Sequence, residues 1–207
     1  MIKSDIIKID NTESVTEAAL KMADEFVETQ GLGGKGAVRM RLLMEETLGM
    51  VRAMTGGFSA DLWLEHDGSE YRIRLNAKTL MDRDKKRELI AVSKSGKNAS
   101  AKGIMGKIGD MIENSMLSFD DSMRAPGEHD AYTGMTGSTD VSQDGMSILG
   151  EGLYWSLSSY RVALEREASA DDEKWDELEK SIIASLSKDV IVGVKRDNID
   201  MTVVGDF

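Results

Sequence analysis

Apolar residues between Gly36 and Met54 recur with the period of a helix. Met40, Leu43, Met44, Thr47, Val51 and Met54 form one stripe, typical of a helix that packs on a core. A second face carries Leu42, Glu46, Gly49, Met50 and Ala53, so Glu46 and Met50 lie one turn apart and point the same way. Gly56 and Gly57 are expected to end this helix.

The next segment changes to the period of a strand. Ala60, Leu62 and Leu64 alternate with polar residues, as do Tyr71, Ile73 and Leu75, and the pattern predicts a hairpin that closes on Asp67-Gly68. Near the end of the chain, Val190, Val192 and Val194 pair in the same way with Ile199, Met201 and Val203 across Asp197-Asn198. One face of each hairpin is apolar, which indicates an antiparallel sheet covered on one face by helices.

Weaker patterns predict the remaining elements. Residues 2–9 are expected to form an edge strand, and Ser14-Val15-Thr16-Glu17 is a capping box that opens a helix through Phe26. Gly31 to Gly36 formally satisfies G-x-G-x-x-G, but a helix precedes it where that motif needs a strand, so we interpret it as an inter-helix loop.

After the first hairpin we expect a charged helix over 80–92, a loop over 93–98 and a helix through 104–116. Residues 118–147 lack periodicity and predict a long loop or mobile insertion. Added helices are expected over 148–188, one from Leu149 to Ala168 and one beginning at Asp171-Asp172. The whole of 1–207 is expected to form a single α+β domain.

Composition narrows the possible functions. The 207 residues carry a net charge of −11, which argues against nucleic-acid and anionic-membrane partners. Cysteine is absent and only two histidines occur, so thiolate and histidine-based metal centres are not expected. We expect His66 to be an exposed turn residue and His129 a loop residue. The sequence shows no signal peptide and no apolar run of membrane-spanning length, so the cytoplasm is the expected location.

Positive charge gathers between Arg83 and Lys107 in this acidic chain. Lys97 and Lys102 flank the expected start of a helix, where an anion could bind. The alternative is a solvated helix and loop without a ligand. Sequence alone leaves both open.

The order of these elements resembles the histidine-kinase-like ATPase fold shared by DNA gyrase, histidine kinases and MutL (the Bergerat or GHKL fold). Within that group it is similar to the anti-sigma-factor serine kinases. The resemblance covers roughly the first 120 residues and the last hairpin, and implies a two-layer α/β sandwich with the terminal hairpin beside the first one and the N-terminal strand at one margin. In that family a helix carries Glu-x-x-x-Asn, whose Asn holds magnesium, and a strand ends in Asp-x-Gly-x-Gly, whose Asp binds adenine.

The corresponding residues here depart from those motifs. Glu46 matches the family's Glu, Met50 replaces the Asn, and Asn76 stands for the Asp without either glycine. Lys102-Gly103-Ile104-Met105-Gly106 resembles the family's phosphate turn loosely. The candidate nucleotide or anion pocket therefore comprises Glu46, Met50, Asn76, Lys97, Lys102, Gly103, Gly106 and Lys107, with Glu46 as candidate base.

Two functions follow from this pattern. The thioether of Met50 does not ligate magnesium. The side chain of Asn76 lacks the negative charge that strengthens a hydrogen bond to adenine. We therefore expect a regulatory module that binds a protein, such as a transcription or signalling regulator, with no cofactor and no ATP turnover. The alternative is a nucleotide-binding enzyme, an anti-sigma-type kinase or ATPase with a non-standard site, in which Lys97, Lys102 and Lys107 act in place of the family's magnesium ion. Its candidate cofactor is ATP, supplied as ATP/Mg. Met50 and Leu80 filling the pocket would favour the first, and an open polar cavity the second.

Overall fold

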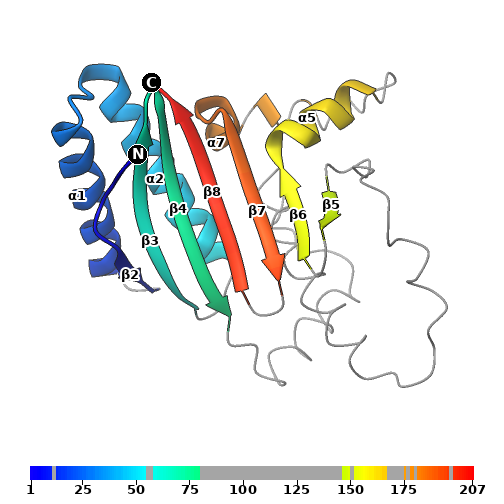
Figure 1. Ribbon diagram of the computed structural model, residues 1–207, viewed down its shortest axis with the longest axis horizontal. Helices are drawn as coiled ribbons and strands as arrows, with labels where there is room; N and C mark the ends of the chain where they lie inside the picture. The colour runs from blue at the N-terminus through cyan, green and yellow to red at the C-terminus, as the bar shows by residue number, and fades with distance from the viewer. Residues whose placement is uncertain are drawn as a thin grey trace.

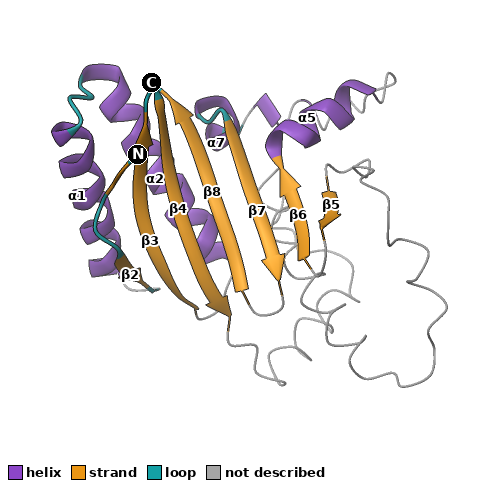
Figure 2. Ribbon diagram, viewed as in Figure 1, coloured by secondary structure: helices purple, strands orange, loops and turns teal. Residues whose placement is uncertain are grey.

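The computed structural model describes residues 1–10, 13–54, 58–79, 146–149, 152–166, 175, 178–179, 181–195 and 198–207. Within these residues the protein is α+β, with one open antiparallel sheet and helices on one of its faces (Figures 1 and 2). The expected helices and loops over 80–116, most of the expected 118–147 loop, and His129 lie outside the described residues.

The sheet is built from two long hairpins that pair with each other. β3 (Phe58–Asp67) and β4 (Glu70–Thr79) form the first, and β7 (Asp189–Lys195) and β8 (Asn198–Asp206) the second. β4 pairs with β8 from Glu70↔Asp206 to Lys78↔Asn198, which confirms the predicted placement of the terminal hairpin beside the first. Asp67 pairs with Glu70, so the turn residues are Gly68 and Ser69 rather than the predicted Asp67 and Gly68. Gly68 has a φ of 68°, a conformation that favours glycine.

Short strands extend both margins of the sheet. β1 (Ile2–Lys3) and β2 (Ile7–Ile9) both pair with β3, so the predicted N-terminal edge strand is confirmed as two pieces. At the other margin β5 (Met146–Leu149) pairs with β6 (Gly152–Ser156), which pairs with β7. The predicted helix from Leu149 was wrong at its start, and so was the predicted loop at residues 146–147.

A helix follows this added hairpin directly. α5 (Leu157–Arg166) begins where β6 ends. Leu153, Leu157, Tyr160 and Leu164 fit a helical period, but Leu153 and Trp155 equally fit a strand, and pairing with β7 decides between them. The segment 148–188 therefore adds strand as well as helix to the fold.

Helices cover the apolar face of the sheet. α1 (Glu13–Thr29) packs on α2 (Gly34–Met54), and α2 passes behind β3, β4 and β8 (Figure 1). Helix α1 begins one residue before Ser14, which therefore lies inside the helix rather than at the predicted cap. Helix α2 begins at Gly34, so the predicted inter-helix loop is shorter than the Gly31–Gly36 motif.

The short helix α7 (Ile182–Leu186) packs on α2. Its N-cap, Ser181, accepts a hydrogen bond from the Ala184 amide. The predicted continuous apolar helix from Asp171 is thus interrupted at Ser181, although Trp175 and Leu178 are helical.

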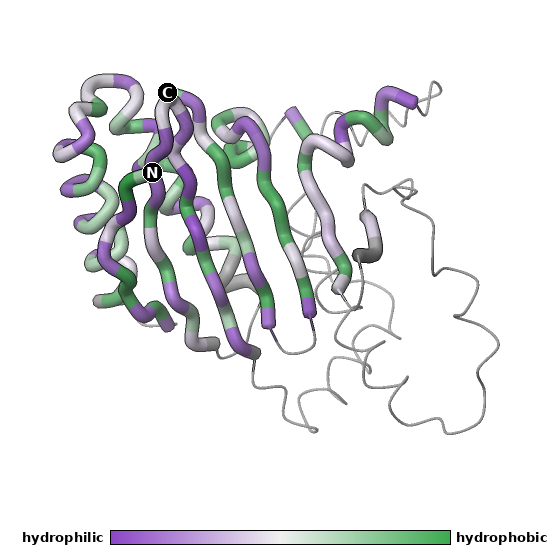
Figure 3. Tube along the Cα trace, viewed as in Figure 1, coloured by the Kyte–Doolittle hydropathy of each residue, from purple (hydrophilic) through white to green (hydrophobic). Residues whose placement is uncertain are grey.

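The core lies between the sheet and the helices. The predicted stripe of α2 is buried at Met40, Leu43, Met44 and Thr47, and the predicted apolar positions of all four long strands face it. Figure 3 shows the hydrophobic stretch in the middle of β7, whereas β4 carries many polar residues. No described helix has the length and apolarity to cross a membrane.

Candidate functional site

Helix α2 holds two of the predicted site residues. Met50 is only 1% exposed and belongs to the hydrophobic core, while Glu46, one turn earlier, is half-buried. The intervening Thr47 is buried, and its hydroxyl donates a 2.6 Å hydrogen bond to the Leu43 carbonyl. Met50 thus packs into the core, while Glu46 keeps access to solvent.

Asn76 lies on the other face of the sheet. Its neighbours Leu75 and Ala77 are buried beneath the helices, so the side chain of Asn76 points away from α2. Its amide Nδ2 donates a 2.6 Å hydrogen bond to Oδ1 of Asp200, and Asn198 donates to Oδ2 of Asp200 at 3.0 Å. The structure therefore does not bring Asn76 together with Glu46 and Met50.

The remaining predicted site residues lie outside the described part of the chain: Lys97, Lys102, Gly103, Gly106, Lys107 and the pocket-filling candidate Leu80. Among the described residues, no group of three or more histidine, aspartate or glutamate side chains could hold a metal ion. A shallow hollow does occur at the start of α2, lined by Gly34, Lys35, Val38 and Arg39. It precedes Glu46 by two helical turns and contains none of the predicted site residues.

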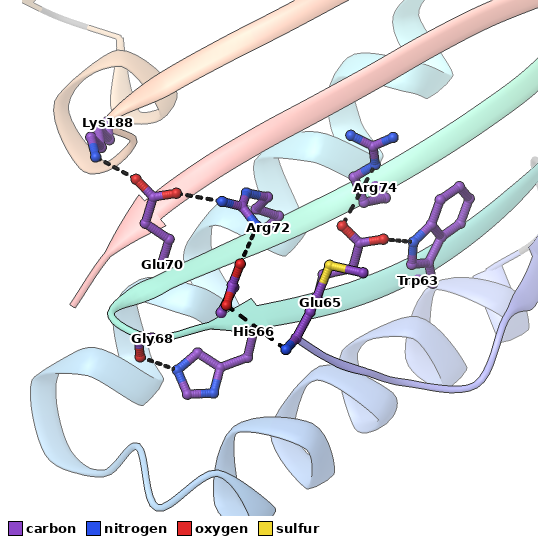
Figure 4. Close-up of polar contacts among 10 residues, drawn as sticks. Trp63, Glu65, His66, Gly68, Glu70, Arg72, Arg74 and Lys188 are labelled. Carbon is purple, nitrogen blue, oxygen red and sulfur yellow. Dashed lines mark hydrogen bonds and ion pairs between the residues drawn. The ribbon is translucent and has the colours of Figure 1, made fainter.

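The face of the sheet that carries Asn76 is not covered by any described helix, and we call it the open face (Figure 1). Trp63 is its largest aromatic residue. The Lys3 ammonium lies 4.3 Å from the Trp63 ring centroid, and the Arg74 guanidinium lies 5.8 Å from it. Glu65 accepts a 2.8 Å hydrogen bond from the indole nitrogen and lies 4.0 Å from Arg74 (Figure 4). Trp63 is thus held in one orientation by its neighbours.

A second polar group lies near the turn end of the same face. Glu70 forms ion pairs with both Lys188 and Arg72 (Figure 4). Hydrogen bonds from Lys188 first, and then from Arg72, hold the pKa of the Glu70 carboxyl below its usual value. The Glu70 carboxylate in turn raises the pKa of the Lys188 ammonium above its usual value. These contacts tie the first hairpin to the segment that leads into β7.

Tyr154 and Ile191 provide exposed apolar surface on β6 and β7. They are 36% and 39% exposed. The Tyr154 ring lies against Gly193, where an added Cβ would stand 2.9 Å from the ring. Glycine is therefore required for the ring to lie flat on the sheet. The alternation of polar and apolar residues predicted a solvent face, but only the structure places Trp63 and Tyr154 on the same side.

His66 differs from the prediction of an exposed turn residue. It lies within β3, is half-buried, and stacks on Tyr71 with ring centroids 4.1 Å apart. Its Nε2 lies 2.7 Å from the Gly68 carbonyl oxygen (Figure 4). Its Nδ1 lies 3.2 Å from Oε1 of Gln30. These contacts give His66 a structural role at the turn.

The class of protein defined by these observations is an α+β protein with an open antiparallel sheet, helices on one face, and a charged and aromatic surface on the other. No protein-family model, curated protein or solved structure matches this chain.

Proposed function

We propose that this chain is a regulatory, protein-binding module on a GHKL-like scaffold that does not turn over ATP. The scaffold part of the proposal is supported by element order. Helices α1 and α2 precede the first hairpin, the terminal hairpin pairs with β4, and the N-terminal strands lie at the β3 margin.

One observation carries the functional part: the residues at the two family motif positions point to opposite sides of the sheet. Met50, which the resemblance aligns with the family's magnesium ligand, is buried in the core, and Asn76 is hydrogen-bonded to Asp200 on the open face. Magnesium requires oxygen ligands, and a nucleotide needs its metal and base contacts in one cavity. The described arrangement supplies neither.

The open face is the proposed partner surface. Trp63, Tyr154 and Ile191 give it apolar area, and aromatic residues are enriched in the energetically important parts of interfaces. Arg74 lies between Trp63 and Ile191 in the strand register, and Glu65, Arg72 and Glu70 lie nearer the turn, so the apolar side chains are interspersed with charges of both signs. A protein surface with complementary charges fits this pattern better than nucleic acid does, given the net charge of −11.

The nucleotide part is tested by a thermal-shift titration with ATP and magnesium. We expect no change in Tm. A rise of several degrees that Glu46→Ala abolishes would establish the alternative function, a nucleotide-binding enzyme. One observation favours this alternative: the half-buried carboxylate of Glu46 forms no hydrogen bond or ion pair with another described residue, so it could act on a ligand.

The partner part is tested by affinity capture from the source cell followed by mass spectrometry. The wild-type protein is compared with Trp63→Ser and Tyr154→Ser, and with Val162→Ser on the exposed surface of α5 as the matched control. We expect a protein that wild type and the control recover and that both open-face variants lose. Equal recovery by all four proteins would refute the open face as the binding surface.

A further inference from the structure

Helix α2 has a solvent-facing stripe that the core does not explain. Successive helix residues are rotated by about 100°, which places seven positions between Gly34 and Met50 within an arc of about 120° centred on Leu42. They are Lys35, Val38, Arg39, Leu42, Glu45, Glu46 and Gly49. Six are exposed and Glu46 is half-buried. We call these residues the α2 stripe.

The middle of the α2 stripe is apolar. Val38 is 60% exposed and Leu42 is 38% exposed, one turn apart on the same side of the helix. The hollow lined by Gly34, Lys35, Val38 and Arg39 continues this surface to the start of the helix. Val38 and Leu42 are therefore adjacent rather than scattered singly, and they form a small contiguous apolar patch at the centre of the stripe.

Gly49 is the second unexplained feature of the α2 stripe. A glycine in the middle of a helix weakens the helix relative to alanine. An added Cβ at Gly49 would meet nothing within 4 Å, so no neighbour in the described structure requires glycine there. A helix from outside the described structure that approaches α2 closely would require it.

The charges of the α2 stripe are divided between its two ends. Lys35 and Arg39 precede Leu42, and Glu45 and Glu46 follow it. Arg41 on the neighbouring side of the helix pairs with Glu45 and Asp24, whereas Lys35, Arg39 and Glu46 have no ion pair with another described residue. A surface that is basic at one end and acidic at the other is complementary to itself when a second copy is turned end to end.

We propose that the α2 stripe is the contact between two copies of this chain, with their α2 helices packed antiparallel about a two-fold axis at Leu42. Arg39 lies three residues before the axis and Glu46 four after it, on the same side of Leu42. The symmetry therefore places Arg39 of each copy beside Glu46 of the partner subunit. Leu42 meets its symmetry mate and Val38 lies beside Glu45 of the partner subunit. Lys35 lies beside Gly49 of the partner subunit, where the missing side chain lets it approach. This self-association is independent of the open face and goes beyond the proposed partner binding.

The test is a charge exchange followed by sedimentation equilibrium across a micromolar concentration series. Wild type is expected to shift from monomer to dimer. Arg39→Glu and Glu46→Arg each set like charges against each other across the axis and are expected to weaken dimerisation by about tenfold or more. The double variant Arg39→Glu/Glu46→Arg restores both pairs and is expected to recover wild-type association. Lys21→Glu, an exposed charge reversal on α1, is the control and should dimerise normally.

A further variant guards against misfolding as the cause of lost association. Gly49→Gln improves helix propensity, so its Tm under monomeric conditions should equal or exceed that of wild type, while its dimerisation is weakened. A wild-type protein that stays monomeric, or single charge reversals without effect, would overturn the proposal. Failure of the double variant to recover would also overturn it, because the Arg39–Glu46 pairs would then not hold the two copies together. All of these outcomes can be separated from the result of the open-face capture experiment.

Discussion

Replacing Met50 by asparagine gives the sharpest test of the idea that this position is core rather than ligand pocket. Truncating a buried methionine to alanine costs about 2–5 kcal/mol, and an unsatisfied buried amide costs about 1–3 kcal/mol more. Asparagine refills part of the volume, so we expect Met50→Asn to lower the free energy of unfolding by about 3–5 kcal/mol. Every buried side-chain nitrogen or oxygen among the described residues already has a hydrogen-bond partner, so no such atom is left to pair with the new amide.

The assay is urea denaturation followed by far-UV circular dichroism, with Tm measured in parallel. For a chain of this length, the expected loss corresponds to a fall in Tm of roughly 6–20 °C. Met50→Leu is the matched control, because it conserves volume and apolarity and should cost less than about 1.5 kcal/mol. Addition of ATP and magnesium should not restore the stability of Met50→Asn.

One result would refute this reasoning directly. If Met50→Asn is as stable as wild type, the side chain at this position contacts water or a polar cavity. If it also gains stability from ATP and magnesium, the family's magnesium site has been rebuilt by a single substitution. In that case the nucleotide-binding alternative would replace the proposed function.

Three further substitutions test individual contacts. Asn76→Asp sets a second carboxylate against Asp200, so we expect a loss of about 0.5–1 kcal/mol in urea denaturation at pH 7 that disappears below pH ~4; an unchanged midpoint would contradict the Asn76–Asp200 bond. For Glu70→Gln, the lowered pKa of Glu70 means that wild type carries extra stability above the unfolded-state pKa, which is lost as pH falls through the folded-state pKa. Tm of wild type should exceed that of Glu70→Gln at pH 7 and converge with it in acid, and a difference independent of pH would exclude the ion pair as its cause. Gly68→Ala should cost about 1 kcal/mol because φ there is positive, whereas Ser69→Ala at the next turn position should cost less.

The alternation of apolar and polar residues predicted the four long strands of the sheet, because each of these strands has one buried face. Leu62, Ile73, Val192 and Met201 all enter the core as their patterns indicated. The β5–β6 hairpin was missed because Leu153 and Leu157 satisfy a helical spacing, and a strand of five residues gives too little pattern to outweigh it. Pairing with β7 is a long-range interaction that local spacing does not reveal.

The candidate site was predicted from motif positions rather than from the faces of its elements. The alternation that buries Leu75 already places Asn76 on the solvent side, because neighbouring strand residues point to opposite faces. The face of the strand on which Asn76 lies could therefore be predicted from the sequence. The burial of Met50 could not, because both α2 faces carried apolar residues and only the packed neighbours select between them.

The pairing of β4 with β8 also governs how the chain can fold during synthesis. Arg74 donates a hydrogen bond to Thr202, 128 positions later, and this strand pair joins the two halves of the sheet. The ribosome must therefore release nearly the whole chain before β8 can pair with β4. Until then, the β4 edge that pairs with β8 stays without that partner. Deleting β8 would divide the sheet into two separate pieces, because no other strand bridges β4 and β7 in the described sheet.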